Sequence, residues 1–246
     1  MFFLKKKSHM NTTPTSDLSG VVILITGSGK GLGFAIAEYL AKRGASVVGV
    51  ARNNSHLQKL RDETEAANIL VLEGDISNEH DVEDIKKAIL SNYPRIDVLI
   101  NNAGVNIHKP LEQLTSEDFG SMVHTNIKGV FLMSQMVIPI MKKSKSGFII
   151  NVGSKISHNT NVQPNNVIYA TTKYAIEGFS FALNKELKKF GIRVSCLMPG
   201  TLNTFFSMKS KEFLSPAHIA EFVEYMITHK EVDFESVVIK SIKQDI

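Results

Sequence analysis

The stretch of residues 21–33, VVILITGSGKGLG, places the strongest constraint on how this chain can fold. Its first five residues are apolar and mostly β-branched, which is typical of a strand buried in a parallel sheet. The glycine-rich run after them opens directly into an apolar helix at Phe34. Glycine has no β-carbon to hold a ligand away from the backbone, and a helix N-terminus offers free N–H groups with a partial positive charge. The stretch therefore predicts a strand, a tight turn and a helix start that bind a pyrophosphate, although a glycine cluster is also typical of a plain turn.

Helical and strand patterns alternate along the rest of the chain. Further strands are expected at residues 45–50, 69–73, 96–100, 147–152, 193–198 and 237–239, and helices at 32–43, 55–67, 79–92, 116–142 and 216–228. Strands that alternate with helices form a parallel sheet with right-handed crossovers. The pattern predicts a doubly wound α/β fold whose sheet has seven parallel strands.

Composition limits the number of domains and the classes of function. The chain has 246 residues, of which 43% are hydrophobic, so a single domain over residues 18–246 can bury a full core. Residues 1–17 carry an apolar patch before their lysines, the reverse of a signal peptide, and are expected to form a disordered arm. The net charge of +4 comes from scattered lysines, which argues against nucleic-acid binding.

Neither a membrane span nor a disulfide is expected. No run approaches the 18 or so apolar residues that a transmembrane helix requires. The single cysteine, Cys196, cannot form an internal disulfide and fits the reducing cytoplasm. No metal site is predicted.

The end of the second strand bears on the choice of cofactor. Dinucleotide enzymes that select NAD usually place an acid there, on the ribose 2′-hydroxyl, but this chain has Ala51 and Arg52. Arg52 is suited to a 2′-phosphate, and Lys30 is a second cation at the same end of the sheet. Both favour NADP(H) over NAD(H). The alternative is an ordinary solvated arginine and a lysine that covers a helix end.

Polar residues follow the third and fourth strands and interrupt an apolar helix. Asp75 and Ile76 come where an adenine edge would lie, but Asp75 is equally suited to cap the next helix together with Ser77. The string Asn101–Gly104, NNAG, ends the fourth strand. Asn126 stands within the helical stretch 116–142, where an asparagine is a poor helix former and a buried amide needs a partner.

Three residues predict proton-transfer chemistry. Tyr169 and Lys173, in YATTK, are four residues apart, so they share one face of a helix. A free tyrosine, with a pKa of about 10, is a weak acid–base catalyst at neutral pH, and a neighbouring cation favours its phenolate. Ser154, after the fifth strand, supplies a hydroxyl that can hold a carbonyl or alcohol oxygen. Taken alone, a Tyr-x-x-x-Lys pair is most often a surface pair.

The conjunction of these motifs resembles the short-chain dehydrogenase/reductase family. TGSGKGLG, NNAG, Asn126, Ser154, YATTK and the pair Pro199-Gly200 occur in that family's order and spacing, over residues 20–200. The resemblance implies a Rossmann fold and a catalytic tetrad of Asn126, which holds a water in the proton relay, with Ser154, Tyr169 and Lys173. Residues implied to bind the cofactor are Gly27, Ser28, Lys30, Gly31, Leu32, Gly33, Arg52, Asp75, Ile76, Asn102, Ala103, Gly104, Tyr169, Lys173, Pro199, Gly200 and Thr204.

The expected function is hydride transfer between NADP(H) and a small carbonyl or alcohol substrate, of the carbonyl or 3-oxoacyl reductase type, with Tyr169 as proton donor or acceptor. One alternative is an NAD-linked alcohol dehydrogenase. Another is a non-catalytic NADP-binding regulator, for which loss of Tyr169 or Lys173 would be expected. The resemblance also implies a homodimer or homotetramer.

Two segments depart from the family or decide specificity. Residues 155–168 are rich in Asn and His, and the family's frequent C-terminal Gly-Gly pair is absent. Substrate choice is expected to lie in residues 203–215, which offer apolar side chains; Lys155, Lys209 and Lys211 are nearby candidates for an anionic group, although ordinary packing and solvated lysines explain them as well.

Overall fold

All of the predicted strands pair in one parallel sheet. The computed structural model describes residues 17–53, 55, 59, 61, 62, 68–158, 162–202 and 213–243. Within these residues the sheet has seven strands in the order β3-β2-β1-β4-β5-β6-β7, and each neighbouring pair is parallel. The strands are β1 (Val22–Thr26), β2 (Ser46–Ala51), β3 (Ile69–Glu73), β4 (Val98–Asn101), β5 (Gly147–Val152), β6 (Ile192–Pro199) and β7 (Ser236–Ile239). The predicted doubly wound, single-domain Rossmann architecture is confirmed.

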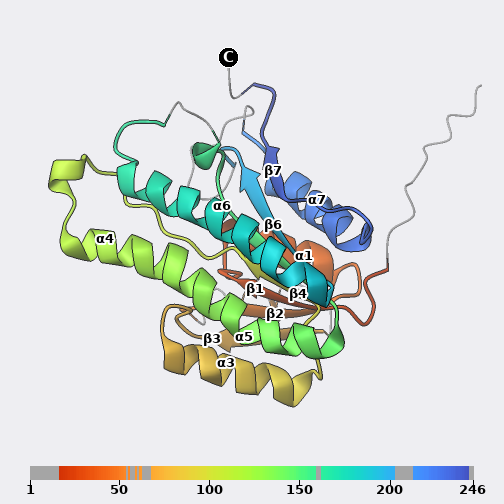
Figure 1. The fold of residues 1–246 in the computed structure, drawn as a ribbon. Helices are drawn as coiled ribbons and strands as arrows, with labels where there is room; N and C mark the ends of the chain where they lie inside the picture. The colour runs from red at the N-terminus through yellow and green to blue at the C-terminus, as the bar shows by residue number, and fades with distance from the viewer. Residues whose placement is uncertain are drawn as a thin grey trace, which may run out of the picture.

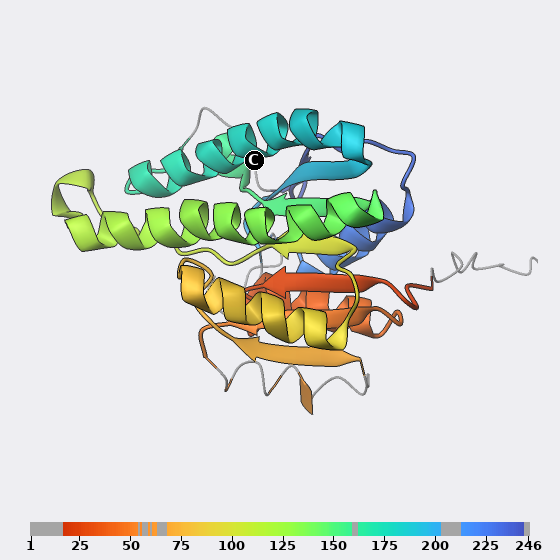
Figure 2. The ribbon, with the colours of Figure 1, turned by 60° about the horizontal axis from the view of Figure 1, so that its bottom comes forward.

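Helices cover both faces of the sheet (Figures 1 and 2). They are α1 (Gly31–Ala41), α3 (Glu79–Asn92), α4 (Ser116–Val123), α5 (Gly129–Ser144), α6 (Val167–Leu187) and α7 (Pro216–Thr228). Helices α1 and α7 pack on one face, and α3, α5 and α6 pack on the other. The predicted helix at 55–67 lies mostly outside the described residues, but positions 55, 59, 61 and 62 are helical.

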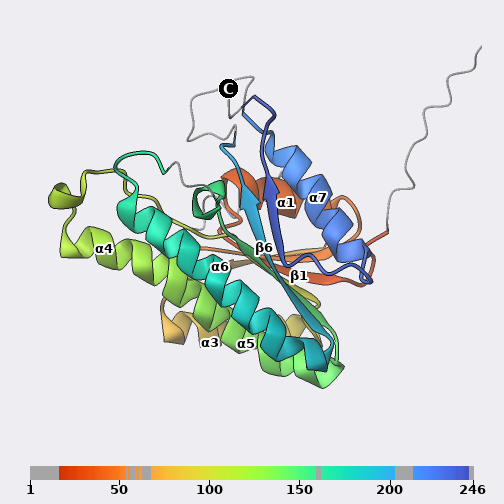
Figure 3. The same cartoon turned by 45° about the horizontal axis from the view of Figure 1, so that its top comes forward.

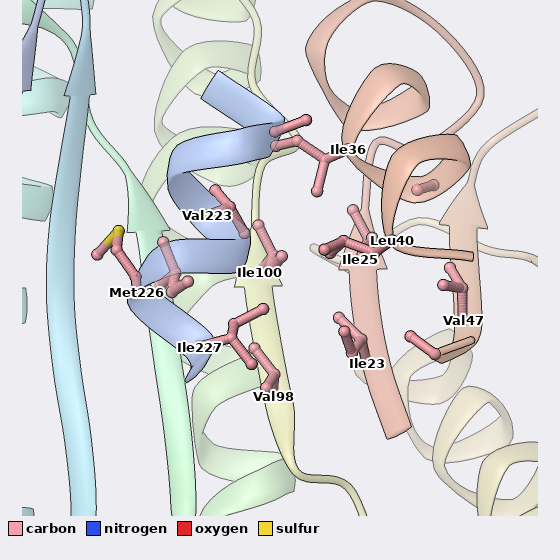
Figure 4. Close-up of a cluster of buried hydrophobic side chains, with 14 of the residues drawn as sticks. Ile23, Ile25, Ile36, Leu40, Val47, Val98, Ile100, Val223, Met226 and Ile227 are labelled. Atoms are coloured by element: carbon pink, nitrogen blue, oxygen red, sulfur yellow. The ribbon is translucent and has the colours of Figure 1, made fainter. Parts of the chain in front are cut away.

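Alternate residues of the central strands face the two helical layers. On the side of α1 and α7, the strands β1 and β4 contribute Ile23, Ile25, Val98 and Ile100 (Figure 4). These side chains pack against Ile36 and Leu40 of α1 and Val223 of α7. Leu24 and Leu99 point to the opposite face, toward α3 and α5. All five residues of β1 are buried because both faces are covered, and this explains why the strand is a continuous apolar run.

The predicted helix at 116–142 is helical throughout but changes its winding in the middle. A π-helical turn, η2 (His124–Lys128), joins α4 to α5. Asn126 lies in this turn, 1% exposed, and its side chain bonds to Val105 and Thr172, outside its own helix. A π turn inserts one residue into the helical ladder, a local change that apolar periodicity does not reveal.

Strand β7 pairs with β6 at the sheet edge, beside α7 (Figure 3). The predicted N-terminal arm, residues 1–17, lies outside the described residues except for Asp17. No helix in the described ranges is both long and apolar enough to cross a membrane.

Candidate active site

A cavity of about 470 Å³ lies at the carboxyl ends of β1 to β4. In a doubly wound sheet this is the edge where ligands bind, beside the point at which the strand order reverses. Ten of the residues predicted to bind a cofactor line it: Gly27, Lys30, Gly31, Leu32, Arg52, Asp75, Ile76, Asn102, Ala103 and Gly104. The structure thus brings together residues from four strand ends that are far apart in the sequence.

Further lining residues were missed from the sequence. They are Gly29, Val50, Ala51, Asn53, Gly74, Val105 and Thr125. All but Thr125 are within four residues of a strand end or belong to the glycine loop, so the strand ends themselves were a signal that could have found them. Thr125 comes from η2, and only its neighbour Asn126 marked that turn in the sequence.

Two glycines of the loop are required by its geometry. Gly27 has φ +66°, and a β-carbon there would lie 2.8 Å from Ala103 Cα. Gly33 sits in the first turn of α1, where a β-carbon would lie 2.4 Å from the Gly27 carbonyl oxygen and 2.3 Å from Asn102 Nδ2. The helix therefore approaches the loop more closely than any other residue would permit.

The NNAG segment holds the glycine loop in place. Asn102 Nδ2 donates hydrogen bonds to the carbonyl oxygens of Thr26 (2.9 Å) and Gly27 (3.2 Å). In return, the Thr26 hydroxyl oxygen accepts from the backbone N–H groups of Asn102 (3.0 Å) and Ala103 (3.1 Å). These four bonds tie the end of β4 to the end of β1, so the loop is fixed before a ligand arrives.

The loop and the start of α1 fit a pyrophosphate. The N-cap position of α1, Lys30, is extended, and no described side chain caps the helix, so its first N–H groups have no side-chain acceptor at the cavity. Ser28 is fully buried, and its hydroxyl has no hydrogen-bond partner among the residues that the structure describes. Ser28 lies outside the cavity lining, so the feature that fits an anionic phosphate is the positive end of α1 with its uncapped N–H groups.

Arg52 and Asp75 both line the cavity. Arg52 is exposed and makes no hydrogen bond or ion pair to another described residue. Asp75 accepts from the backbone N–H (2.8 Å) and hydroxyl (2.7 Å) of Ser77. Burial raises the pKa of Asp75, but the Ser77 bonds and the Arg52 charge outweigh it and hold that pKa below its ordinary value.

The alternative interpretation of Asp75 as a helix cap is wrong. The N-cap of α3 is Asn78, whose Oδ1 accepts from His80 N and Asp81 N. Asp75 lies three residues too early, and its turn with Ser77 leads into the cap instead of forming it. The carboxylate remains at the cavity wall, where the other interpretation placed it.

Tyr169 and Lys173 share one face of α6, next to the end of β5. Lys173 is 5% exposed, and its Nζ donates to the carbonyl oxygen of Val152 at 2.8 Å. The same Nζ lies 5.7 Å from the centroid of the Tyr169 ring. Tyr169 and Ser154 are both half-buried, and Ser154 follows Val152 by two residues. The Lys173–Val152 bond therefore anchors α6 beside the segment that carries the Ser154 hydroxyl.

The Asn126 side chain uses both of its amide protons within the protein. Its Nδ2 donates to Val105 O (2.9 Å) and to the Thr172 hydroxyl (3.0 Å), while its Oδ1 accepts from Val105 N (2.8 Å). Both amide protons are used, so the side chain could hold a water only through a lone pair of Oδ1. Asn126 thus links the segment after β4 to α6 at Thr172, the residue that directly precedes Lys173.

Gly104 connects the cavity with the residues on α6. A β-carbon on Gly104 would lie 3.4 Å from Asn126 Oδ1 and 3.7 Å from Lys173 Nζ. Ser154, Tyr169 and Lys173 do not themselves line the 470 Å³ cavity, which covers the half of the edge above β1 to β4. Gly104 therefore lines the cavity and also lies next to the side chains of Asn126 and Lys173.

The remaining predicted residues differ in position. Pro199 is the last residue of β6, and Gly200 donates its N–H to Ile239 O at 2.7 Å, so both lie at the same sheet edge without lining the cavity. Thr204 and most of the substrate segment, residues 203–212, lie outside the described residues, as do residues 159–161. The described part of the chain contains no group of three metal-ligating side chains.

Comparisons with known proteins agree with this architecture. Residues 21–215 match the family described as short chain dehydrogenase. An uncharacterized oxidoreductase of Staphylococcus aureus is 30% identical over 230 residues, which cover 92% of this chain and 99% of that protein.

Two of the similar solved structures were determined with nicotinamide cofactors. A 3-ketoacyl-(acyl-carrier-protein) reductase from Brucella melitensis, complexed with NADH, is 29% identical with a TM-score of 0.86, covering 92% of this chain and 99% of its own. An alcohol dehydrogenase from Thermococcus sibiricus, complexed with 5-hydroxy-NADP, is also 29% identical, with a TM-score of 0.83 and coverage of 91% and 97%.

Proposed function

Because this chain belongs to the short-chain dehydrogenase/reductase family of NAD(P)-dependent oxidoreductases, we propose that it reduces a small carbonyl substrate with NADPH, using Tyr169 as the proton donor. The observation that carries the proposal is Lys173, a buried ammonium held 2.8 Å from Val152 O and 5.7 Å from the Tyr169 ring. Burying an ammonium group costs free energy unless the group is hydrogen-bonded or lies near a group that can carry negative charge. At Lys173 that neighbour is the Tyr169 phenol, whose phenolate a positive charge would favour.

The chain's own residues would act on the carbonyl oxygen. When bound, NADPH supplies the hydride that the carbonyl carbon accepts. The Ser154 hydroxyl donates a hydrogen bond to the carbonyl oxygen and orients it. Tyr169 gives its proton to that oxygen as it becomes an alcohol, and Lys173 stabilises the phenolate that Tyr169 leaves behind. Asn126 keeps α6 against the segment after β4 through Thr172 and Val105.

The cofactor would be held by the glycine loop, with Arg52 deciding between NADPH and NADH. The pyrophosphate would lie at the start of α1, where the first N–H groups of the helix have no side-chain acceptor. Arg52 would bind the 2′-phosphate, with Lys30 as a second cation at the rim. Asp75, which also lines the cavity, would accept from the adenine amine.

As the substrate we propose a ketone or 3-oxoacyl thioester, which the similarity to a 3-ketoacyl-(acyl-carrier-protein) reductase supports. The similar alcohol dehydrogenase favours, as the second candidate, oxidation of an alcohol at the same site. A non-catalytic regulator is a weaker candidate because Tyr169 and Lys173 are both present and adjacent.

Subunit pairing and location complete the proposal. Large aromatic side chains on α4, α5 and α6 are exposed: Phe119 (49%), Phe131 (45%), Tyr174 (47%) and Phe181 (53%). These faces would pair in a homodimer or homotetramer. Cys196 is buried and unpaired, which fits the cytoplasm.

Two measurements test the function. The first is a panel of ketones, aldehydes and 3-oxoacyl thioesters in which NADPH consumption is followed by absorbance. The second compares Tyr169→Phe with Tyr174→Phe, a matched control on the same helix whose side chain is 47% exposed. Loss of a general acid should lower kcat by about 10²–10⁴-fold. The control should keep kcat within about twofold of the parent, because Tyr174 is not among the residues that line the cavity and Phe keeps its ring at the proposed subunit interface.

The affinity for NADPH separates the assigned role from a structural one. Tyr169→Phe removes one hydroxyl, so its Kd for NADPH should stay within a few-fold of the parent value. A Tyr169→Phe enzyme that turned over nearly as fast as the parent would show that another group supplies the proton. Loss of both turnover and NADPH binding would show that Tyr169 shapes the cofactor site instead.

A further inference from the structure

The residue at the N-cap position of α6 does not cap the helix with its side chain. Residues 155–168, which are rich in Asn and His, run into the start of α6, and the N-cap position is Asn166. An asparagine at this position usually accepts hydrogen bonds from the first N–H groups of the helix. The Asn166 side chain accepts none of them, although it is buried and its backbone oxygen accepts from Ala170 N at 2.8 Å. Its amide is therefore directed to partners outside the helix.

The Asn166 amide joins α6 to the segment after β4. Its Oδ1 accepts from Asn106 Nδ2 at 3.1 Å, across 60 residues of sequence. Its Nδ2 donates to the carbonyl oxygens of Pro164 (3.2 Å) and Gln163 (3.4 Å), just before the helix. Both ends of the amide are thus engaged, and a long-range bond takes the place of the local cap. This bond fixes where the first turn of α6 lies relative to the end of β4.

A second tie to the same segment lies further along α6. The hydroxyl of Thr172, which is fully buried, donates to Tyr169 O at 2.7 Å and accepts from Asn126 Nδ2 at 3.0 Å. Asn126 in turn bonds both backbone groups of Val105, accepting from its N–H at 2.8 Å and donating to its carbonyl oxygen at 2.9 Å. The Thr172 hydroxyl therefore connects the backbone of Tyr169 itself to the segment after β4.

The two ties lie on either side of Tyr169 and end on neighbouring residues. Asn166 is three residues before Tyr169 and Thr172 is three residues after it, so all three lie on one side of the helix. Their partners are Asn106, bonded directly, and Val105, bonded through one side chain. Val105 also lines the proposed cofactor cavity. The turn of α6 that carries Tyr169 is therefore held against the cavity wall from both of its ends.

We propose that Asn166 and Thr172 are positioning residues that set the distance from the Tyr169 phenol to the cofactor cavity. The inference rests on the proposed function, in which Tyr169 gives its proton to the substrate while NADPH supplies the hydride. Neither residue lines the cavity, so each would act through Tyr169 and not through contact with the cofactor. A displacement of about 1 Å at a reacting group can cost about 10²-fold in rate, so loss of either tie should lower kcat.

The first test changes one hydroxyl at a time in α6 of the full-length protein. Thr172→Val keeps the shape of the side chain but removes the hydroxyl, so kcat with NADPH and the best substrate of the carbonyl panel should fall about tenfold or more. Thr172→Ser keeps the hydroxyl and should restore kcat to within about threefold of the parent. Thr171→Val, the same change at the neighbouring exposed residue, removes only a bond to Val167 O and should stay within about twofold. The Kd for NADPH, measured by fluorescence, should stay within about threefold of the parent in all three variants.

A second test uses the exposed end of the Asn166 tie, where folding is not at risk. Asn106→Ala removes the donor to Asn166 and should lower kcat about tenfold. Asn166→Ala should lower kcat at least as much, and the double variant should be no slower than Asn166→Ala alone, because both changes remove one shared bond. Asn165→Gly removes a neighbouring amide that takes part in neither tie. Glycine adopts the φ of +65° found at that position without strain, so this control should stay within about twofold of the parent.

Tyr169→Phe distinguishes failure of this inference from failure of the proposed function. If Tyr169→Phe were inactive while Thr172→Val or Asn106→Ala kept the parental kcat, the positioning role would be wrong and Tyr169 would remain the proton donor. The role would also be wrong if Thr172→Ser were as slow as Thr172→Val, or if NADPH affinity fell in parallel with kcat. If Tyr169→Phe kept the parental turnover, the proposed function and the positioning role would fall together.

Discussion

Gly33→Ala is the substitution whose consequence the structure specifies most closely. The new β-carbon would lie 2.4 Å from the Gly27 carbonyl oxygen, about 1 Å inside ordinary contact distance, and 2.3 Å from Asn102 Nδ2. The carbonyl is backbone and cannot rotate away. Asn102 cannot move freely either, because Nδ2 already donates to Thr26 O and Gly27 O. Helix α1 must therefore move back from the loop, or the Asn102 bonds must break.

The cost follows from three contributions. Overpacking of a close contact costs about 1–3 kcal/mol. Loss of one or two Asn102 hydrogen bonds adds about 1 kcal/mol each. Alanine gains at most about 1 kcal/mol over glycine in a helix, which offsets part of this. The net destabilisation is about 2–3 kcal/mol, or a fall in Tm of roughly 5–10 °C for a domain of this size.

The assay is thermal unfolding at one fixed protein concentration, with Gly178→Ala as the control. Gly178 lies within α6, is exposed, and has no described heavy atom within 4 Å of where its β-carbon would be. That variant should gain stability, by up to about 1 kcal/mol, so the two glycine-to-alanine changes should shift Tm in opposite directions. NADPH affinity should fall in Gly33→Ala alone. If Gly33→Ala were as stable as the parent, the close approach of α1 to the loop would not be a constraint on this fold.

Three other outcomes are expected. Arg52→Asp should lower the ratio of NADPH affinity to NADH affinity by about tenfold or more, measured by fluorescence titration. The control Arg61→Asp, which makes the same change of charge, should leave that ratio unchanged. An equal ratio in the two variants would show that Arg52 does not select the cofactor. Burial and a hydrogen bond to Glu224 raise the pKa of Tyr39 to about 12, above the value of about 10 expected in the unfolded chain. The stability that this tyrosine contributes is therefore complete below pH 10 and lost as the pH rises through 12, so urea midpoints of Tyr39→Phe should fall less over that range than those of the parent. Phe131→Lys places a charge on an exposed aromatic position of α5, so light scattering should show a lower mass than for the parent, closer to the 27.2 kDa monomer; a parent that is already monomeric would refute the subunit pairing.

Local chemistry allowed much of the fold and part of the site to be predicted from the sequence. A strand buried on both faces must be apolar throughout, so β1 was visible as a run of five such residues. Tyr169 and Lys173 had to share a face because helical geometry alone sets the positions of residues i and i+4. The glycine pattern likewise predicted the strand-to-helix turn. The positive φ of Gly27 in the structure agrees with that prediction.

The structure decided what depends on contacts between distant segments. The sequence offered Asp75 as a cap of α3, but the next turn brought Asn78 into the capping position. It also singled out Asn126 without naming the partners of its amide, and the π turn directs both amide protons to Val105 and Thr172. In each case several hydrogen-bonding groups compete for one polar side chain, and which partner wins depends on distances that only the packed chain sets.

Arg193 is a clear example of this dependence. In the sequence it is an ordinary charged residue at the start of a strand. Its guanidinium lies over the Phe148 ring and donates to carbonyl oxygens at the end of α7 only because β5 and β6 are neighbours in the sheet and α7 packs on that face. Apolar periodicity predicts which face of each element is buried, because it depends only on the spacing of residues that are close in the sequence. The order of the strands fixes which polar groups meet at the sheet edges, and that order is set by the packing of the whole chain.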